Sequence, residues 1–349
     1  MSSLIIGIDL AKSIFQIHGI DGRGQVVVRR KLRRSELLPF LASHPKEDSL
    51  IAMEACASAH HWGRLLREMG YKVVLLPPHH VKPFVAPGKK NDANDAAAIA
   101  EAAIRPHIHA VPIKSEEQQA VLMQHSCRAL LVRQRTMLVN ALRTHLAEFG
   151  LIAPKGIENV DRLVDAMTEA VLPEVARHVL DMLVQQINDL DTQIDDLHKR
   201  IQDHAKSQSL CRLLTGIPGI GPVTASLLVA SVPDINVFAS ARHFAAWLGL
   251  VPRQNSSGGK SRLGGISKTG NVDLRCHLVL GSTSLLAVAR KNSPPPMLAW
   301  VCALLKRKSS ARLVSVAIAN KLARIVWAVL KTGTAFEPNR WIARQQGAV

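Results

Sequence analysis

Short apolar runs separated by turn residues dominate the first hundred positions. They predict five strands, at Leu4–Leu10, Ile14–Ile20, Gln25–Lys31, Leu50–Met53 and Lys72–Leu76. Helices are expected over Ser35–Ser43, over Ala57–Met69 and from Asn91 onward. Three strands in succession, followed by strands that alternate with helices, favour an α/β RNase H-like sheet: a meander of three antiparallel strands, then parallel strands with helical crossovers.

The middle of the chain has the pattern of long helices. Ser115 and Gln118 form a capping-box pattern, Gly150 is a stop signal, and a second helical region ends near Lys206. In that region apolar residues alternate by four and three: Ala176, Leu180, Leu183, Ile187, Leu190, Ile194, Leu197 and Ile201. This heptad seam fits a coiled-coil dimerisation arm and also a helical hairpin that packs on itself, and the two are compatible.

The remainder of the chain is predicted to be mostly helical. We therefore expect three domains, over residues 1–112, 113–207 and 208–349. The stretch Thr215–Ala225 is rich in glycine and proline and has the form of a helix-hairpin-helix turn. Its glycines would let the backbone approach a phosphate, although a packing turn without any ligand would have the same composition.

Charge is distributed unevenly along the 349 residues. The chain has 44 Lys+Arg and 27 Asp+Glu, a formal charge of +17, and residues 241–349 hold 17 of the bases but only Asp273 and Glu337 as acids. A basic last third that is also rich in apolar residues indicates a folded region with a polyanionic partner, most plausibly nucleic acid.

Several classes of protein are not expected. There is no uncharged apolar stretch of about 18 residues, which argues against a membrane span, and no basic segment precedes the first strand, which argues against a signal peptide. The five cysteines are scattered without a C-x-x-C pair. This predicts neither a disulfide framework nor a zinc site, and it fits a reducing cytoplasm.

Four carboxylates occupy positions that would converge in the expected sheet. Asp9 ends the first strand, Glu54 ends the fourth, and Asp92 and Asp95 share one face at the start of the helix after the fifth. Each alone could be a turn or capping residue. Together they would repel one another without a cation, and oxygen ligands of this kind suit Mg²⁺ or Mn²⁺, the ions used for strand cleavage and transfer.

A glycine-rich loop with two serines is the second candidate site. Ser256 and Ser257 lie among four cations that could stabilise phosphoryl oxygens, namely Arg253, Lys260, Arg262 and Lys268. A serine here could attack a phosphate, or it could only donate a hydrogen bond to one, and the residues themselves leave both readings open.

Together these motifs resemble the DEDD transposases of bacterial insertion sequences, the IS110 family, whose members are bridge-RNA-guided recombinases. The resemblance is carried over nearly the whole chain by Gly7-Ile8-Asp9, Met53-Glu54-Ala55, the stretch 91–96, the Gly-Ile-Pro-Gly-Ile-Gly turn and the serine loop through Leu274-Arg275. It implies a RuvC-like N-terminal domain, a coiled-coil middle and a C-terminal transposase domain.

The resemblance also implies roles for individual residues. Asp9, Glu54, Asp92 and Asp95 would bind the metal, and Ser257, which directly precedes a glycine, would join covalently to DNA, with Ser256 as the neighbour that could be confused with it. Further implications are a structured guide RNA that pairs with donor and target DNA, and a tetramer in which the two halves of the site come from different subunits.

Other functions remain open on the sequence alone. Related DNA invertases share the motifs, a RuvC-like junction nuclease would need the carboxylates but no serine, and an architectural nucleic-acid-binding protein would need neither. The expected location of the protein is the bacterial cytoplasm, in association with the nucleoid.

Overall fold

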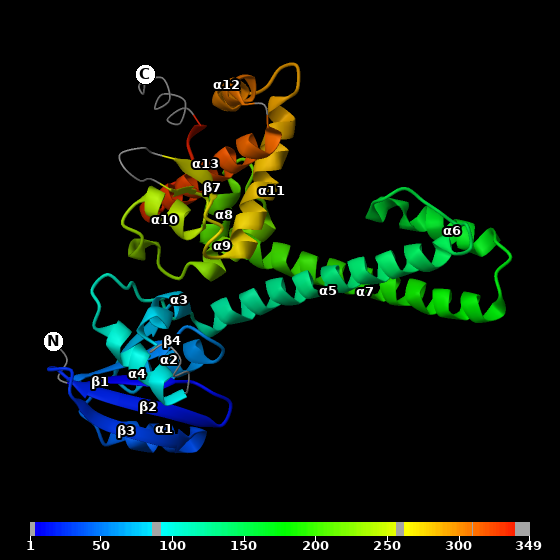
Figure 1. The fold of residues 1–349 in the computed structure, drawn as a ribbon. Coiled ribbons are helices and arrows are strands. Elements are labelled where there is room, and N and C mark those ends of the chain that lie inside the picture. The colour runs from blue at the N-terminus through cyan, green and yellow to red at the C-terminus, as the bar shows by residue number, and fades with distance from the viewer. Residues whose placement is uncertain (1–3, 86–91, 256–261, 309, 339–349) are drawn as a thin grey trace. The chain divides into compact units, whose positions relative to one another are not determined.

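The computed structural model of the protein describes residues 4–85, 92–255, 262–308 and 310–338, with two compact units (Figure 1). The first unit comprises Met1–Gln119 and Val232–Val237, and the second comprises Ala120–Ser231 and Phe238–Val349. The expected division into three domains stays a prediction.

The first unit is built on a five-stranded mixed sheet with the strand order β3-β2-β1-β4-β5. Its strands are β1 (Leu4–Asp9), β2 (Ile14–Asp21), β3 (Val26–Arg33), β4 (Ser49–Glu54) and β5 (Lys72–Leu76). The first three strands pair antiparallel, whereas β4 pairs parallel with β1 and β5 pairs parallel with β4. This is the RNase H-like arrangement that the sequence predicts.

Helices cover both faces of this sheet. Ile6 and Ile8 of β1 join a core with side chains of α1 (Leu37–Ala42) and α2 (Ala59–Glu68). The alternate β1 residue Ile5 instead packs with Ala100 of α4 (Asp92–Ala103), so α4 lies on the opposite face.

The second unit is largely helical. Its helices are α5 (Glu116–Ala147, which begins in the first unit), α6 (Val160–Glu169), α7 (Glu174–Ser207), α8 (Ser209–Thr215), α9 (Pro222–Ser231), α10 (Ala241–Trp247), α11 (Val272–Ala289), α12 (Ala299–Arg307) and α13 (Ala311–Thr332). A two-stranded ribbon, β6 (Pro252–Gln254) and β7 (Leu263–Ile266), interrupts them. A short helix α3 (Pro78–Val81) and five 3-10 turns complete the described elements: Arg34–Glu36, Lys82–Phe84, Ile157–Asn159, Ile235–Val237 and Pro296–Leu298.

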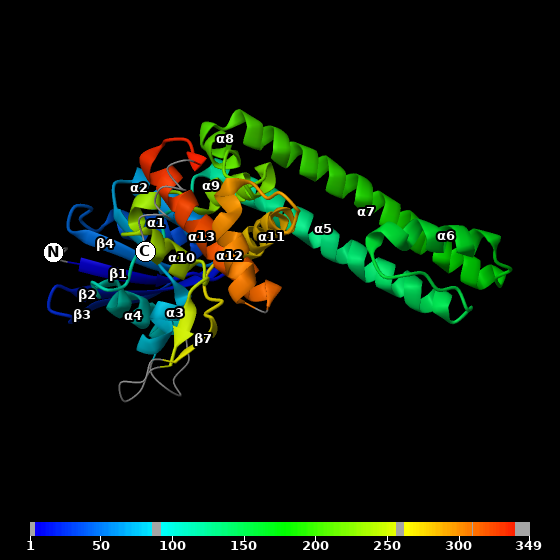
Figure 2. The same ribbon diagram turned by 90° about the horizontal axis from the view of Figure 1, so that it is seen from above.

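The long helices α5 and α7 run side by side, and α6 packs against them (Figure 2). The predicted capping box is present, since the amide of Gln118 donates to Ser115 Oγ at 3.1 Å and the amide of Ser115 donates to Gln118 Oε1 at 3.0 Å. Every second position of the predicted seam is buried within the chain: Leu180, Ile187, Ile194 and Ile201. Leu180 and Ile187 pack with side chains of α5 and α6, so this part of the seam lies inside the hairpin, as in the second of the two readings.

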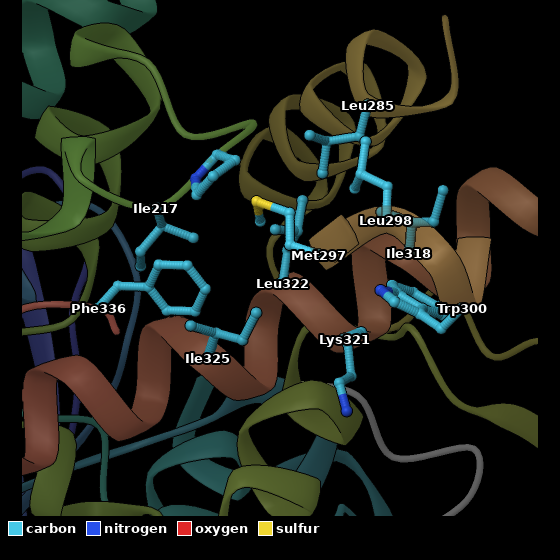
Figure 3. A pocket seen from close by; sticks show the side chains of 11 residues that line it. Ile217, Leu285, Met297, Leu298, Trp300, Ile318, Lys321, Leu322, Ile325 and Phe336 are labelled. Carbon is cyan, nitrogen blue, oxygen red and sulfur yellow. The ribbon is translucent and has the colours of Figure 1, made fainter. Parts of the chain in front are cut away.

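The glycine-rich turn between α8 and α9 packs backbone against backbone on α11. Gly219 has φ +87°, and a Cβ on Gly281 of α11 would lie 1.9 Å from the Gly219 carbonyl oxygen. Ile217 faces apolar side chains of α11 and α13 around a cavity of about 20 Å³ (Figure 3). Because that volume holds about one water molecule, this side of the turn is a packing surface.

Two helices of the second unit, α11 and α13, are long and apolar enough to cross a membrane by length and composition alone. Both carry charged residues, such as Arg275 in α11 and Lys321 in α13. Both also bury part of their surface among the neighbouring helices. Core helices of soluble proteins pass the same test of length and composition.

Candidate functional site

Asp9 and Glu54 leave the sheet at the same edge. Strands β1 and β4 are parallel with Ile8 opposite Met53, and the next residue in each strand is the carboxylate that ends it. Asp95 lies in the first turn of α4, on the same face of the sheet, and all three carboxylate residues are half-buried. The structure thus brings together three of the four predicted acids.

The electrostatics of Glu54 show how close these groups are. Burial raises the pKa of Glu54, and the negative charges of Asp9 and Asp95 raise it further. The pKa of the nearby Cys56 thiol is raised by burial and then by Glu54 and Asp9. The negative charge of Glu54 is therefore unfavourable in the protein without a metal ion.

A close helix–strand approach places Asp95 there. A Cβ on Gly7 would lie 2.3 Å from the carbonyl oxygen of Ala96 and 2.7 Å from the amide nitrogen of Ala100. Only glycine leaves room for α4 to lie directly on β1 at this point. Gly7 is thus the residue that brings the first turn of α4 up to Asp9.

The carboxylates fit a divalent cation by their chemistry. They offer only oxygen ligands, and their mutual repulsion is relieved by a cation between them. Within the described part of the chain, no group of three or more His, Cys, Asp or Glu side chains is arranged closely enough to hold a metal ion. Asp92 begins α4, and its side chain lies outside the described residues, as do Asn91 and the preceding loop.

The serine loop joins the two strands of the ribbon in the second unit. Ser256, Ser257 and Lys260 lie outside the described residues. On either side of them, β6 and β7 pair antiparallel, and the amide of Asn255 donates to the carbonyl of Arg262 at 2.8 Å. The segment 256–261 therefore connects two ends that are held next to each other.

Three of the predicted phosphate-binding cations lie along or beside this ribbon: Arg253 within β6, Arg262 just before β7 and Lys268 just after it. Arg253, Arg262 and Lys268 are exposed, and the Arg253 guanidinium donates to the carbonyl of Ser267 at 3.0 Å. Lys268 has φ +57°, an uncommon backbone conformation outside glycine. Their roles in binding nucleic acid stay predictions.

One residue that holds the ribbon in place was named in the sequence analysis only as part of a motif, without a role. Arg275 of α11 is buried and donates to the carbonyls of Leu248 at 3.0 Å and Thr269 at 2.7 Å. A Cβ on Gly270 would lie 1.8 Å from the carbonyl oxygen of Trp247, so the segments before and after the ribbon touch backbone to backbone. We call the contacts of Arg275 with Leu248 and Thr269 the clamp. In the sequence, the one signal for it is that Gly270 and Arg275 belong to the same motif as Lys268 and Asn271.

Comparison with known proteins matches both parts of the chain to transposase families. Residues 6–150 match a DEDD transposase model of IS110 type, described as a transposase, and residues 211–297 match the model described as "Transposase IS116/IS110/IS902 family".

Relatives align over almost the whole chain. A probable family 20 transposase of Pseudomonas aeruginosa is 45% identical over 95% of this chain and 98% of its own length. The transposase for insertion sequence element IS1111A of Coxiella burnetii is 40% identical over 93% of this chain and 89% of its own. A pilin gene-inverting protein of Moraxella bovis is 23% identical over 97% of this chain and 98% of its own.

Proposed function

Because this chain belongs to the IS110 family of DEDD transposases, enzymes that carry out phosphoryl transfer on DNA, we propose that it is an RNA-guided recombinase that excises and integrates an insertion sequence. The observation that carries the proposal is the set of half-buried carboxylates at one edge of an RNase H-like sheet, where Asp9 and Asp95 raise the pKa of Glu54. Such an arrangement is unfavourable by itself and becomes useful when a cation is bound.

In this proposal Asp9, Glu54, Asp92 and Asp95 hold Mg²⁺ or Mn²⁺ in a RuvC-like domain. The ions, when bound, stabilise the negative charge that develops on the phosphoryl oxygens during transfer. The carboxylates themselves set the position of these ions relative to the sheet edge, and Gly7 sets the distance between α4 and β1.

Ser257 is proposed as the nucleophile. Its Oγ forms a bond to a DNA phosphorus and loses its proton, while the bond from that phosphorus to a deoxyribose oxygen breaks and the leaving oxygen takes up a proton. The hydroxyl of another strand would then attack the same phosphorus and lose its proton, while the bond from the phosphorus to Ser257 Oγ breaks and the serine takes up a proton. One phosphodiester is exchanged for another, so no external energy source is needed. Arg253, Lys260, Arg262 and Lys268 are proposed to stabilise the phosphate charge.

The partners follow from the same proposal. They are donor and target DNA, a structured guide RNA that pairs with both, and further copies of the chain in a tetramer. In this assembly the carboxylates and the serine of one site come from different subunits. The complex would work in the bacterial cytoplasm, on nucleoid DNA.

The deciding experiment compares two neighbouring serines. Full-length wild type, Ser257→Ala and Ser256→Ala are incubated with labelled insertion-end DNA, guide RNA and Mg²⁺, and the products are separated on a denaturing gel. Wild type and Ser256→Ala should form a covalent protein–DNA band and recombinant product. Ser257→Ala should form neither, yet bind DNA with nearly unchanged affinity, because a nucleophile is needed for the reaction and not for binding. A serine that only donated a hydrogen bond to a phosphate would contribute about 1.5–3 kcal/mol to binding, so its loss would weaken binding and still leave measurable product.

Two results would contradict this assignment. A band that persists in Ser257→Ala and disappears in Ser256→Ala would move the nucleophile to Ser256. Cleavage by the wild type without any covalent band would favour a metal-dependent junction nuclease, in which water replaces the serine.

Site-specific inversion is the second candidate function. It is favoured by one observation, the alignment of a pilin gene-inverting protein along nearly the whole chain. The same assay separates the two functions when the substrate carries two sites in inverted orientation. A recombinase of the inverting kind would flip the intervening segment, whereas a transposase would release or insert the element.

A further inference from the structure

Positively charged side chains are concentrated at the end of the edge strand β3, in the same unit as the candidate carboxylate site. Residues 29–34 read Arg-Arg-Lys-Leu-Arg-Arg, and every cation among them is exposed. The guanidinium of Arg34 stacks at 5.1 Å from the Trp62 ring centroid. By contrast, Arg29 and Lys31 form no ion pair within the described part of the chain.

Strand register places Lys31 in one row with the carboxylates. Lys31 pairs with Gln16 of β2, and Gln16 pairs with Asp9 of β1. Residues paired in this way project to the same face of a sheet, so Lys31 and Asp9 share the face that α4 covers. Two strand spacings of about 4.8 Å separate their backbones, which is about 10 Å in all.

A second pair of residues on the same face, Arg29 and His18, also places a cation beside β2. Arg29 pairs with His18, two residues along from Lys31 and Gln16, so it lies on the same face. Burial lowers the pKa of His18, and the positive charge of Arg29 lowers it further, which shows that the guanidinium lies close to the ring. In this pair Arg29 therefore carries the positive charge, and His18 is neutral at pH 7.

A hollow opens on this face between the edge of the sheet and α4. Its cavity volume is about 270 Å³, far more than one water needs. It is lined by Gln16, His18, Arg29 and Lys31 from the sheet and by Asn94 and Ala97 from α4, with Ile17 and Arg30 also contributing. Asn94 directly precedes Asp95, so the hollow and the carboxylates share the first turn of α4.

We propose that this hollow binds backbone phosphates of the DNA strand on which the carboxylates act. The proposal rests on the proposed function, since it takes the carboxylate edge as the place of reaction. Arg29 and Lys31 supply charge and donors for phosphate oxygens, and Gln16 and Asn94 supply amide donors. The hollow extends from Gln16, beside Asp9, to Lys31, whose backbone is about 10 Å from that of Asp9, so it would hold a phosphate close to the reacting one on the same strand.

The occupant is DNA and not guide RNA because of this distance. A strand that enters the carboxylate edge for reaction must continue past it, and the basic hollow between α4 and strands β2 and β3 adjoins the carboxylates on this face of the sheet. A guide RNA can bind anywhere that leaves its pairing bases free, so its position is not tied to the carboxylates. The contact is therefore assigned to the reacting strand.

Affinity and its salt dependence test the proposal. Full-length Arg29→Gln/Lys31→Gln is compared with wild type and with Arg23→Gln/Arg67→Gln, a control with the same charge change at an exposed turn residue and an exposed residue of α2 on the other face of the sheet. Fluorescent insertion-end duplex DNA is titrated over a range of NaCl concentrations. The first variant should bind several-fold more weakly, and its log–log salt slope should be smaller by one to two, at about 0.9 for each lost phosphate contact.

The control should match the wild type in both affinity and slope, and Mg²⁺-induced thermal stabilisation should be equal in all three proteins. Equal DNA affinity and slope in the two double variants would overturn the proposal. A loss confined to guide RNA, measured in the same way with DNA binding unchanged, would also overturn it and assign the hollow to RNA. Because binding is measured without turnover, a wild type that fails to recombine DNA would refute the proposed function without deciding this test.

Discussion

Like charge held close together is the defining feature of the site at the level of single residues. Asp9 and Asp95 lie near enough to Glu54 for their negative charges to raise its pKa, and all three residues are half-buried. Burial strengthens this repulsion because the surrounding dielectric is lower than that of water. The folded protein therefore carries an electrostatic penalty at this edge, which a bound divalent cation would relieve.

Replacing Glu54 should reveal this penalty directly. A carboxyl whose pKa is raised on folding contributes most stability at low pH and loses it as the pH rises through the folded pKa. Metal-free Glu54→Gln should therefore melt higher than the wild type at pH 7, by on the order of 2–4 °C for each kcal/mol of relieved repulsion. The difference should shrink toward pH 4.5, and DNA cleavage should be lost.

Thermal unfolding with and without Mg²⁺ supplies the comparison for this variant. The ion should raise the melting temperature of the wild type more than that of Glu54→Gln, since the variant lacks one ligand. A variant that melts lower than the wild type at pH 7 without metal would show that the Glu54 carboxylate is stabilising, contrary to the repulsion argument.

At the level of elements, one close contact sets the geometry of the site. Helix α4 touches strand β1 at Gly7, and this contact positions Asp95 relative to Asp9. A helix normally stands off from a sheet by the length of the side chains between them, about 10 Å between the layers. Removing the side chain of Gly7 allows the shorter approach.

Gly7→Ala should push α4 away from β1. The added Cβ would meet backbone atoms of α4 that cannot rotate aside, so we expect about 1–3 kcal/mol of lost stability and a large loss of cleavage. Gly22→Ala, in the turn after β2, is the matched control because nothing lies within 4 Å of its Cβ. Melting curves and cleavage rates are compared. Wild-type cleavage by a stable Gly7→Ala protein would disprove the positional role of this contact.

The exposed apolar face of α5 is a better candidate for self-association than the buried positions of the heptad seam in α7. Met123, Leu130 and Met137 follow one another at intervals of seven residues, and their side chains are 68%, 45% and 71% exposed. In contrast, the α7 residues Ile187 and Ile194 are buried within the chain. A charge at the buried positions would destabilise the hairpin itself. The exposed stripe can therefore be tested without unfolding the helix.

Met123→Lys/Met137→Lys should lower the sedimentation mass of the full-length protein and leave its helical circular dichroism unchanged. Ala129→Lys/Thr136→Lys is the matched control, because these exposed positions of α5 lie about 100° around the helix from the stripe. It should sediment as the wild type does. Equal masses for both variants would exclude the stripe from the interface.

For the whole molecule, charge is distributed in two ways. Residues 241–349 carry a large excess of bases in the sequence, while the first unit has little net charge but a local basic strand beside its carboxylates. Both regions indicate polyanion binding. Residues 241–349 do so by their overall positive charge, and the first unit does so by the position of its basic strand beside the carboxylates. Net charge alone describes only the first.

Nucleic-acid binding by the full chain should therefore fall steeply with salt. The triple variant Lys306→Gln/Arg307→Gln/Lys308→Gln removes exposed cations at the end of α12. For duplex DNA its log–log slope should be smaller by up to about 2.7, at about 0.9 per phosphate contact. Titrations at several NaCl concentrations measure the slope. An affinity that does not change with salt would contradict the charge argument for the whole protein.

Local patterns in the chain were enough to predict the order of strands and helices in the first unit, the capping box at Ser115 and the strand ends that carry Asp9 and Glu54. These features are local, because side-chain alternation, caps and turns act within a few residues. A resemblance in motifs then led to the transposase family, which the relatives confirm.

Which distant residues come into contact could not be predicted from these local patterns, because it depends on how the folded elements pack. The row from Lys31 through Gln16 to Asp9 depends on strand register, the approach of Asp95 depends on the contact at Gly7, and the clamp of Arg275 on Leu248 and Thr269 depends on how α11 packs. A shift of one residue in register would move Lys31 to the other face of the sheet. Register and packing are set by the whole folded core, so no local pattern in the chain contains them.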